Sequence, residues 1–410
     1  MQAYYGNVIL DREQIEKILT VGSAIRLTVK LFPASDGDKL FPPTYEGGKY
    51  AKERRIMADG SIMDTVLLDS VQSQANRMEN ALLDAIRLGA VKLPLMKVDF
   101  QGVNGLDAIS TLETPHRIAD AIFRESIIGG IPFRDSDIGK AFIESTARDA
   151  TGMFQYCPHA LVFGVWDSTG STGIGNKFQR IITSEIIGMN AHYGVKTKSR
   201  IDPVIRGGAR TELYETADGG WTIDPEQAVK EKGKPKKYGK KVSELNLGNV
   251  TPTIEELGGG VTISHAIHSA VISIPAIRKL HFPVDGKENP EVNNKGRSVI
   301  MALALSALSH SIEQGYDLRS RCLLVPQGEP QYEFIDSKGN ASAFSISAEK
   351  ADSILNNAID EARNAGLPWL DHDVILNANP RFMRLIAENL KKDSMNNSSD
   401  SQSESVENGE

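Results

Sequence analysis

Residues 67–86 repeat their apolar side chains at the spacing of a helix with one buried face. Leu67, Val71, Ala75, Met78, Leu82 and Ile86 follow one another in steps of three or four residues. The opposite face carries amides and hydroxyls instead of the usual Lys and Glu. Its residues are Ser73, Asn76, Arg77 and Asn80, with Asp69 and Gln72 beside them. Such side chains suit contacts to sugars, phosphates or base edges, or hydrogen bonds to a neighbouring loop of the same protein.

Strand and helix patterns alternate along the rest of the chain at irregular intervals. Alternating apolar residues predict strands at residues 24–32 and 263–277, with shorter strands at 321–325 and 332–335. Helical periodicity predicts helices over residues 297–314 and 348–365. The irregular spacing favours an α+β fold with insertions over a doubly wound parallel sheet.

A glycine- and hydroxyl-rich loop, residues 167–176, lies between two apolar segments. We expect a buried strand at residues 160–166 before it and a helix at residues 177–189 after it. Backbone amides at such a helix start could hold a phosphate, although a plain capping turn has the same sequence. The loop lacks the nucleotide-triphosphate pattern, because Asn176 precedes Lys177 and Phe178 replaces the hydroxyl residue. The candidate phosphate-binding residues are Ser168, Thr169, Gly170, Ser171, Thr172, Lys177, Gln179 and Arg180.

Charge is unevenly distributed in this chain. The net charge is −7, yet residues 177–241 hold fourteen Lys or Arg against eight Asp or Glu. Residues 230–241 alone contain seven lysines, which predicts either a solubilising loop or an arm that follows a phosphate backbone. Arg206 and Arg210, which precede this run within residues 177–241, are further candidates for contact with a phosphate backbone. The last seventeen residues, 394–410, contain four acids and no base, and we expect them to be disordered.

Several other protein classes find little support in the sequence. No apolar run is long enough to span a bilayer, and the first residues lack the pattern of a signal peptide. Two cysteines form no disulfide framework, which favours a reducing cytoplasm. His265 and His268 fall on opposite faces of their predicted strand and cannot share a metal there. We find no catalytic constellation, and we expect no cofactor and no structural metal.

Two motifs together resemble a known family. The amide-rich stretch DSVQSQANRMENALL follows FPPTYEGGKY, and about a hundred residues later comes STGSTGIGNKFQRIITSEIIG. These segments resemble the backbone subunit of the CRISPR Cascade effector in the type I-U branch, also called I-G. The resemblance covers roughly residues 20–390.

The resemblance implies a particular fold and role in antiviral defence. The fold would be an RNA-recognition-type core, a ferredoxin-like βαββαβ sheet, formed by residues 1–199 and 261–393. An inserted basic thumb hairpin would occupy residues 200–260. Copies would assemble head-to-tail along a guide RNA (crRNA), beside other Cascade subunits, in the prokaryotic cytoplasm. Target DNA would be read by base pairing with the guide, and the subunit itself would not be an enzyme. The aromatic signature of ribonucleoproteins is missing in its usual form.

Two other hypotheses stay open from the sequence. A metal-dependent endoribonuclease on the same fold could use Asp36 or Asp38, which follow the first predicted strand. A small-molecule phosphate enzyme could use the glycine-rich loop. Cleavage of bound RNA in magnesium would identify the first, and stabilisation by nucleotides but not by RNA would identify the second.

Overall fold

The computed structural model describes residues 12–167, 177–203, 211–239, 245 and 249–400. The contacts within the chain group it into two compact units. The first comprises residues 1–192 and 261–383, and the second comprises residues 193–260 and 384–410. The second unit thus begins seven residues before the predicted thumb segment.

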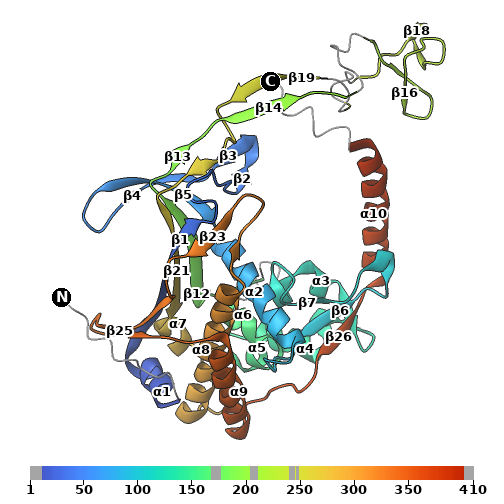
Figure 1. Ribbon diagram of the computed structural model, residues 1–410. Helices are drawn as coiled ribbons and strands as arrows, with labels where there is room; N and C mark the ends of the chain where they lie inside the picture. The colour runs from blue at the N-terminus through green and yellow to red at the C-terminus, as the bar shows by residue number, and fades with distance from the viewer. Residues whose placement is uncertain (1–11, 168–176, 204–210, 240–244, 246–248, 401–410) are drawn as a thin grey trace. The chain divides into compact units, whose positions relative to one another are not determined.

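A nine-stranded, fully antiparallel sheet forms the centre of the first unit (Figure 1). Its strands are β1 (Gly22–Pro33), β4 (Lys52–Ile56), β5 (Ile62–Asp69), β12 (Ile182–Met189), β21 (His265–Ser273), β22 (Tyr316–Asp317), β23 (Leu323–Pro326), β24 (Gln331–Asp336) and β25 (Ala341–Phe344). The order is β22-β23-β1-β21-β12-β5-β4, and β24 also pairs with β1 and β25. In the central register Val29 lies opposite His268, which in turn lies opposite Ile186.

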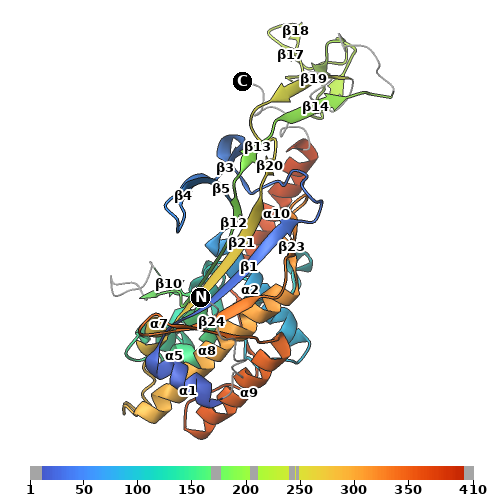
Figure 2. The ribbon, with the colours of Figure 1, turned by 60° about the vertical axis from the view of Figure 1, so that its left-hand side comes forward.

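Helices cover one face of this sheet, as Figures 1 and 2 show. They are α1 (Arg12–Val21), α2 (Val71–Arg87), α6 (Pro158–Phe163), α7 (Ile274–Arg278), α8 (Pro290–Glu313) and α9 (Ala348–Asn364). Helix α8 packs against α2, α6 and α9, and α2 also contacts β12. Every residue of α8 from Ser298 to Ser309 is buried, so this helix forms the core of the unit.

A smaller mixed sheet flanks the core. It has the order β7-β6-β26-β8-β9, in which only β6 and β26 run parallel. The bounds are β6 (Met96–Asp99), β7 (Ile109–Ser110), β8 (Ser126–Ile128), β9 (Ile131–Pro132) and β26 (Val374–Ala378). Short helices surround it: α3 (Ala121–Arg124), α4 (Asp137–Glu144) and α5 (Thr151–Tyr156). Two hairpins complete the unit, β2 (Thr44–Tyr45) with β3 (Lys49–Tyr50) and β10 (Val165–Trp166) with β11 (Lys177–Phe178).

The second unit contains two-stranded ribbons and most of helix α10. The ribbons pair β14 (Lys196–Arg200) with β19 (Val250–Glu255), β15 (Tyr214–Glu215) with β16 (Trp221–Thr222), and β17 (Lys230–Glu231) with β18 (Lys234–Pro235). The chain passes between the units through β13 (His192–Tyr193) and β20 (Val261–Thr262), and again within α10 (Pro380–Asp400). Because α10 continues to Asp400, the first seven residues of the expected disordered tail are helical.

The sequence predictions for the two segments around the glycine-rich loop are wrong. Residues 160–166 contain the end of helix α6 and the short strand β10, not one buried strand. Pro158 fits the first turn of that helix, and Gly164, with φ of 81°, ends it. Residues 177–189 form strands β11 and β12 instead of a helix. The apolar residues in 177–189 recur every four to five positions, a spacing that fits a helix or a strand. Hydrogen-bonded pairing of β12 with β21 on one side and β5 on the other selects the strand.

Candidate nucleic-acid interface

Helix α2 begins later than the apolar periodicity predicts. Leu67 and Asp69 belong to β5, and Ser70 caps the helix by accepting a hydrogen bond from the backbone N–H of Ser73 at 3.2 Å. The predicted faces are otherwise present. Ala75, Met78 and Leu82 are buried, whereas the amides of Gln72, Asn76 and Asn80 are exposed and Ser73 and Arg77 are half-buried. The helix therefore presents a row of solvent-exposed amide side chains beside one arginine.

Asp69 is not part of that polar face, because its side chain is fully buried. Its Oδ2 atom accepts hydrogen bonds from Arg77 Nε at 2.9 Å and from Gln74 Nε2 at 2.7 Å. Its Oδ1 atom accepts one from Arg319 Nη2 at 3.2 Å. The two guanidinium groups remain 32% and 27% exposed. Two arginines on one carboxylate leave an excess positive charge at this surface, which favours an anion.

A chain of buried hydrogen bonds fixes this cluster to the central sheet. Ser184 on β12 donates to Gln74 Oε1 at 2.9 Å and lies 2.7 Å from His268 Nε2. The other ring nitrogen of His268 lies 3.1 Å from the Tyr316 hydroxyl. Burial lowers the pKa of His268 to about 4, so the ring is neutral at pH 7. When Nε2 donates to Ser184 and Nδ1 accepts from Tyr316, each side chain in this series of hydrogen bonds has a partner.

The turn between β22 and β23 contributes the rest of the cluster. Arg77 donates its terminal N–H groups to the carbonyls of Asp317 and Leu318, which attaches α2 to this turn. Arg321 is exposed and lies over the ring of Phe41, with its guanidinium 4.3 Å from the ring centroid. The sequence analysis missed Arg319 and Arg321, and the Arg-Ser-Arg run at a strand turn was the only signal.

Asp36 and Asp38, the candidate metal ligands, lie in the exposed loop that follows β1. Asp38 lies 3.9 Å from Arg321, and Asp36 adopts a positive φ of 48°. In the part of the chain that the structure describes, no three His, Cys, Asp or Glu side chains gather into a possible metal site. The ribonuclease hypothesis therefore has no third ligand among these residues.

The hairpin β10–β11 carries the second set of predicted site residues. Ser168, Thr169, Gly170, Ser171 and Thr172 lie outside the described residues. Lys177 pairs across the hairpin with Trp166, and its Nζ atom lies 5.8 Å from the centroid of the Trp166 ring. Gln179 is exposed, while Arg180 is half-buried and donates from Nε to the Phe163 carbonyl at 3.0 Å. Because β11 replaces the predicted helix, no helix dipole supports a phosphate here.

The base of this hairpin rests on buried charges. Arg117 and Glu79 form a bidentate ion pair, and Arg117 Nη1 donates to the Gly164 carbonyl at 2.9 Å. Cys157 Sγ lies 3.3 Å from His159 Nε2 nearby. Burial raises the pKa of the thiol to about 12 and lowers the pKa of the imidazole to about 3. Both groups are neutral at pH 7, so they do not form a thiolate nucleophile.

The lysine-rich segment is partly neutralised where the structure describes it. Lys236 contacts Glu215 at 2.7 Å and Lys237 contacts Glu212 at 2.5 Å. Lys232 and Gly233 form the turn of the β17–β18 hairpin with positive φ angles of 52° and 78°, as hairpin turns require. Arg206 and Arg210 lie outside the described residues. An exposed hairpin in this segment is compatible with both alternatives, a solubilising loop and an arm that follows a phosphate backbone.

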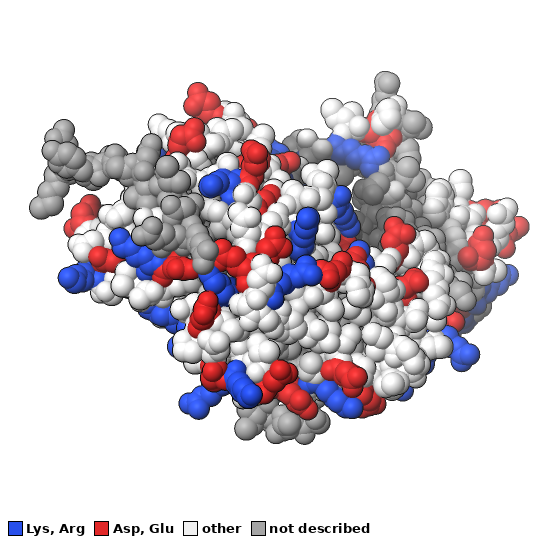
Figure 3. Space-filling model, turned by 90° about the horizontal axis from the view of Figure 1, so that it is seen from below, with Lys and Arg blue, Asp and Glu red and all other residues white. Residues whose placement is uncertain are grey.

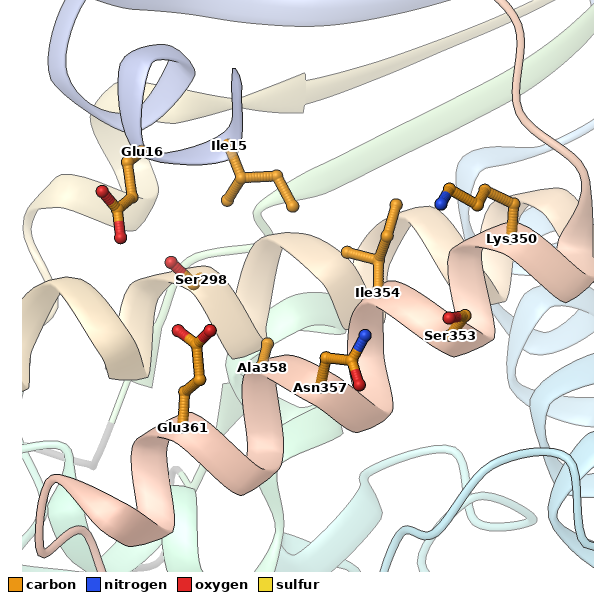
Figure 4. Close-up of a pocket in the computed structure, with 9 residues that line it drawn as sticks. All are labelled: Ile15, Glu16, Ser298, Lys350, Ser353, Ile354, Asn357, Ala358 and Glu361. Atoms are coloured by element: carbon orange, nitrogen blue, oxygen red, sulfur yellow. The ribbon is translucent and has the colours of Figure 1, made fainter. Parts of the chain in front are cut away.

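A cavity of about 190 Å³ lies between α1, α8 and α9 (Figure 4). Ile15 and Ile354 line it, and Glu16 and Glu361 point toward one another across Ser298. Lys295 Nζ bridges these two carboxylates at 3.1 and 2.8 Å, so the ionic groups there serve to join three helices.

The face seen from below in Figure 3 shows acidic and basic side chains interspersed, as on an ordinary solvated surface.

Part of the chain matches a known protein family. Residues 25–193 match the family described as CRISPR-associated protein GSU0053. This match indicates a CRISPR-associated protein. The matched region includes α2, Asp69 and the β10–β11 hairpin, and it points to a role in CRISPR defence. No curated protein matches the chain. No helix within the described residues is long and apolar enough to cross a membrane.

Proposed function

We propose that this protein is the backbone subunit of a type I-U Cascade effector, which binds guide RNA along its phosphate backbone and is not itself a nuclease. The observation that carries the proposal is the pair of Arg77 and Arg319 on Asp69, beside the exposed amides of α2, with Arg321 exposed two residues after Arg319. Arginines that share a buried carboxylate are held in place before binding, which lowers the entropy cost of contacting a phosphate. Amides beside them suit ribose hydroxyls and base edges.

The strand order supports an RNA-recognition-type core. The strands β24, β1, β21 and β12 lie side by side in that order, all antiparallel. Along the chain, α2 lies between β1 and β12, and α8 lies between β21 and β24. This order agrees with the βαββαβ arrangement that we propose for the core, with β4 and β5 added at one edge. Residues 193–260 come between the second and third of these strands along the chain, β12 and β21, and they include the segment that we propose as the thumb.

Assembly on RNA follows from the same proposal. Neighbouring copies would contact one another through two different surfaces, so the contact would not close into a dimer. Target DNA would then pair with the guide, and the protein would contribute position and charge rather than sequence recognition. Among the described residues the ribonuclease alternative lacks a third metal ligand, so we do not prefer it.

Fluorescence anisotropy with a labelled single-stranded RNA tests the proposal. Binding should weaken with salt, with a log-log slope of about −0.7 per phosphate contact. Arg321→Ala should weaken binding and make the slope shallower. Arg363→Ala is the matched control, because Arg363 is also exposed and ion-paired but lies on α9, where it contacts Asp371. Absence of RNA binding, or equal effects of the two variants, would contradict the proposal.

A further inference from the structure

A second pocket lies beside the β10–β11 hairpin, between α6, β11 and α7. Its volume is about 230 Å³. Buried apolar side chains form most of its lining: Leu161, Phe178, Ile181, Ala276 and Leu280. Such a slot accepts a flat or compact apolar group that is driven in by loss of water contact.

The polar groups around the pocket are cationic or neutral. Lys177, Lys279 and Gln179 line it as exposed side chains. For neither lysine does the structure record a carboxylate partner among the described residues. An occupant that satisfies this lining has an apolar body and carries negative charge. It can also exchange hydrogen bonds with the Gln179 amide, which both donates and accepts.

An exposed aromatic ring adjoins this pocket. Trp166 is 63% exposed, although tryptophan is usually well buried in folded proteins. Lys177 connects the two features, because it lines the pocket and also lies over the Trp166 ring. Aromatic rings interleaved with lysines are how proteins hold single-stranded nucleic acid, since every base has a face that can stack.

We propose that this pocket and Trp166 together bind one unpaired nucleobase of a single-stranded RNA. The base lies in the apolar slot with its face against Trp166, its edge meets the Gln179 amide, and the flanking phosphates lie at Lys177 and Lys279. This inference rests on the proposed RNA binding, but it assigns base contact to a surface separate from the Arg77–Arg319 cluster. An acidic peptide with an apolar residue is the competing occupant, and it explains the exposed Trp166 less well.

The experiment compares two RNAs of equal length and charge, one with all its bases and one with abasic riboses, by fluorescence anisotropy. Wild-type protein should bind the abasic RNA more weakly. Trp166→Ala should weaken binding of the base-bearing RNA about 5- to 150-fold, as removal of a stacking aromatic does. It should leave binding of the abasic RNA unchanged. Ala276→Leu, which fills the slot, should act in the same direction, with thermal melting to establish that the variant is folded.

Matched controls separate this site from general charge. Ile375→Ala removes another large exposed apolar side chain, 50% accessible, on β26 and should leave both RNAs unaffected. Lys279→Ala should make the salt slope shallower by about 0.7, whereas Lys338→Ala at the β24–β25 turn should not. Equal affinity of wild-type protein for both RNAs would overturn the nucleobase site while leaving phosphate binding intact. Binding of a glutamate-rich peptide that is lost in Trp166→Ala, without any base dependence, would assign the pocket to a protein partner. Absence of binding to either RNA would overturn both proposals.

Discussion

Glu79 and Arg117 form a bidentate ion pair inside the first unit, with both N–O distances 2.7 Å. Both side chains are almost completely buried. Glu79 extends from the buried side of α2, and Arg117 also holds the carbonyl of Gly164 just before β10. One ion pair thus links the helix of the arginine cluster to the hairpin of the proposed nucleobase site.

Removing one partner of this pair should be costly. Arg117→Met leaves the Glu79 carboxylate buried without its hydrogen-bonded partner, and the free energy of unfolding should fall by about 3–5 kcal/mol. Replacing both residues, Glu79→Leu with Arg117→Met, should recover much of that loss, because neither member of the pair then leaves the other unpaired. Urea denaturation measures both changes. If the two substitutions add without recovery, the pair does not interact as its geometry indicates.

Arg77 should contribute to stability as well as to RNA binding. Arg77→Ala removes one of the two guanidinium groups on the buried Asp69 and should lower the free energy of unfolding by about 1–3 kcal/mol. Asn76→Ala changes an exposed neighbour on the same helix and should stay within about 0.5 kcal/mol of wild type. Thermal or chemical denaturation separates the two. An Arg77 variant as stable as the Asn76 variant would show that Asp69 does not depend on this partner.

His268 predicts how stability changes with pH. Its pKa is about 4 in the folded protein, and an unfolded histidine has a pKa of about 6.5. As the pH falls, the unfolded state therefore takes up the proton first and becomes favoured. The stability difference between wild type and His268→Asn should shrink by up to about 1.4 kcal/mol per pH unit between about pH 6.5 and 4. A difference that is constant over this range would mean that His268 is not held neutral.

Gly164 should resist substitution. Its φ of 81° and ψ of 154° suit glycine alone, and an added Cβ would approach the Arg180 backbone nitrogen to 3.0 Å. Gly164→Ala should cost about 1–3 kcal/mol and displace the β10–β11 hairpin. Gly239→Ala, at a position with open space and no positive φ, is the control. Equal stability of the two variants would refute the strain argument.

Periodicity in the sequence predicted the elements whose apolar spacing fits only a helix or only a strand. The α+β class, strand β1 and helix α9 follow from apolar spacing, whereas α8 is buried on all sides and begins seven residues before the predicted residue 297. The apolar segments at residues 160–166 and 177–189 are compatible with both helix and strand, and pairing with distant strands decides them. A single sequence carries no signal for that pairing.

In the candidate site, too, the sequence predicted residues that one helix places together and missed residues that only tertiary contacts bring together. The exposed amides Gln72 and Asn76 were predicted because they lie on one helix face. Arg319 and Trp166 were missed because their roles come from contacts made only in three dimensions, with Asp69 and with Lys177. Asp69 was placed on the polar face because the strand that contains it reads as the first turn of the helix.

Light scattering on RNAs of increasing length tests the central claim most directly. If the protein binds guide RNA along its phosphate backbone and assembles head-to-tail, the mass of the complex should rise with RNA length in steps of one 44.7 kDa chain plus its share of RNA. Arg77→Ala combined with Arg321→Ala should reduce that growth at equal protein and RNA concentrations. A complex of fixed mass at every RNA length, or no complex at all, would contradict the account.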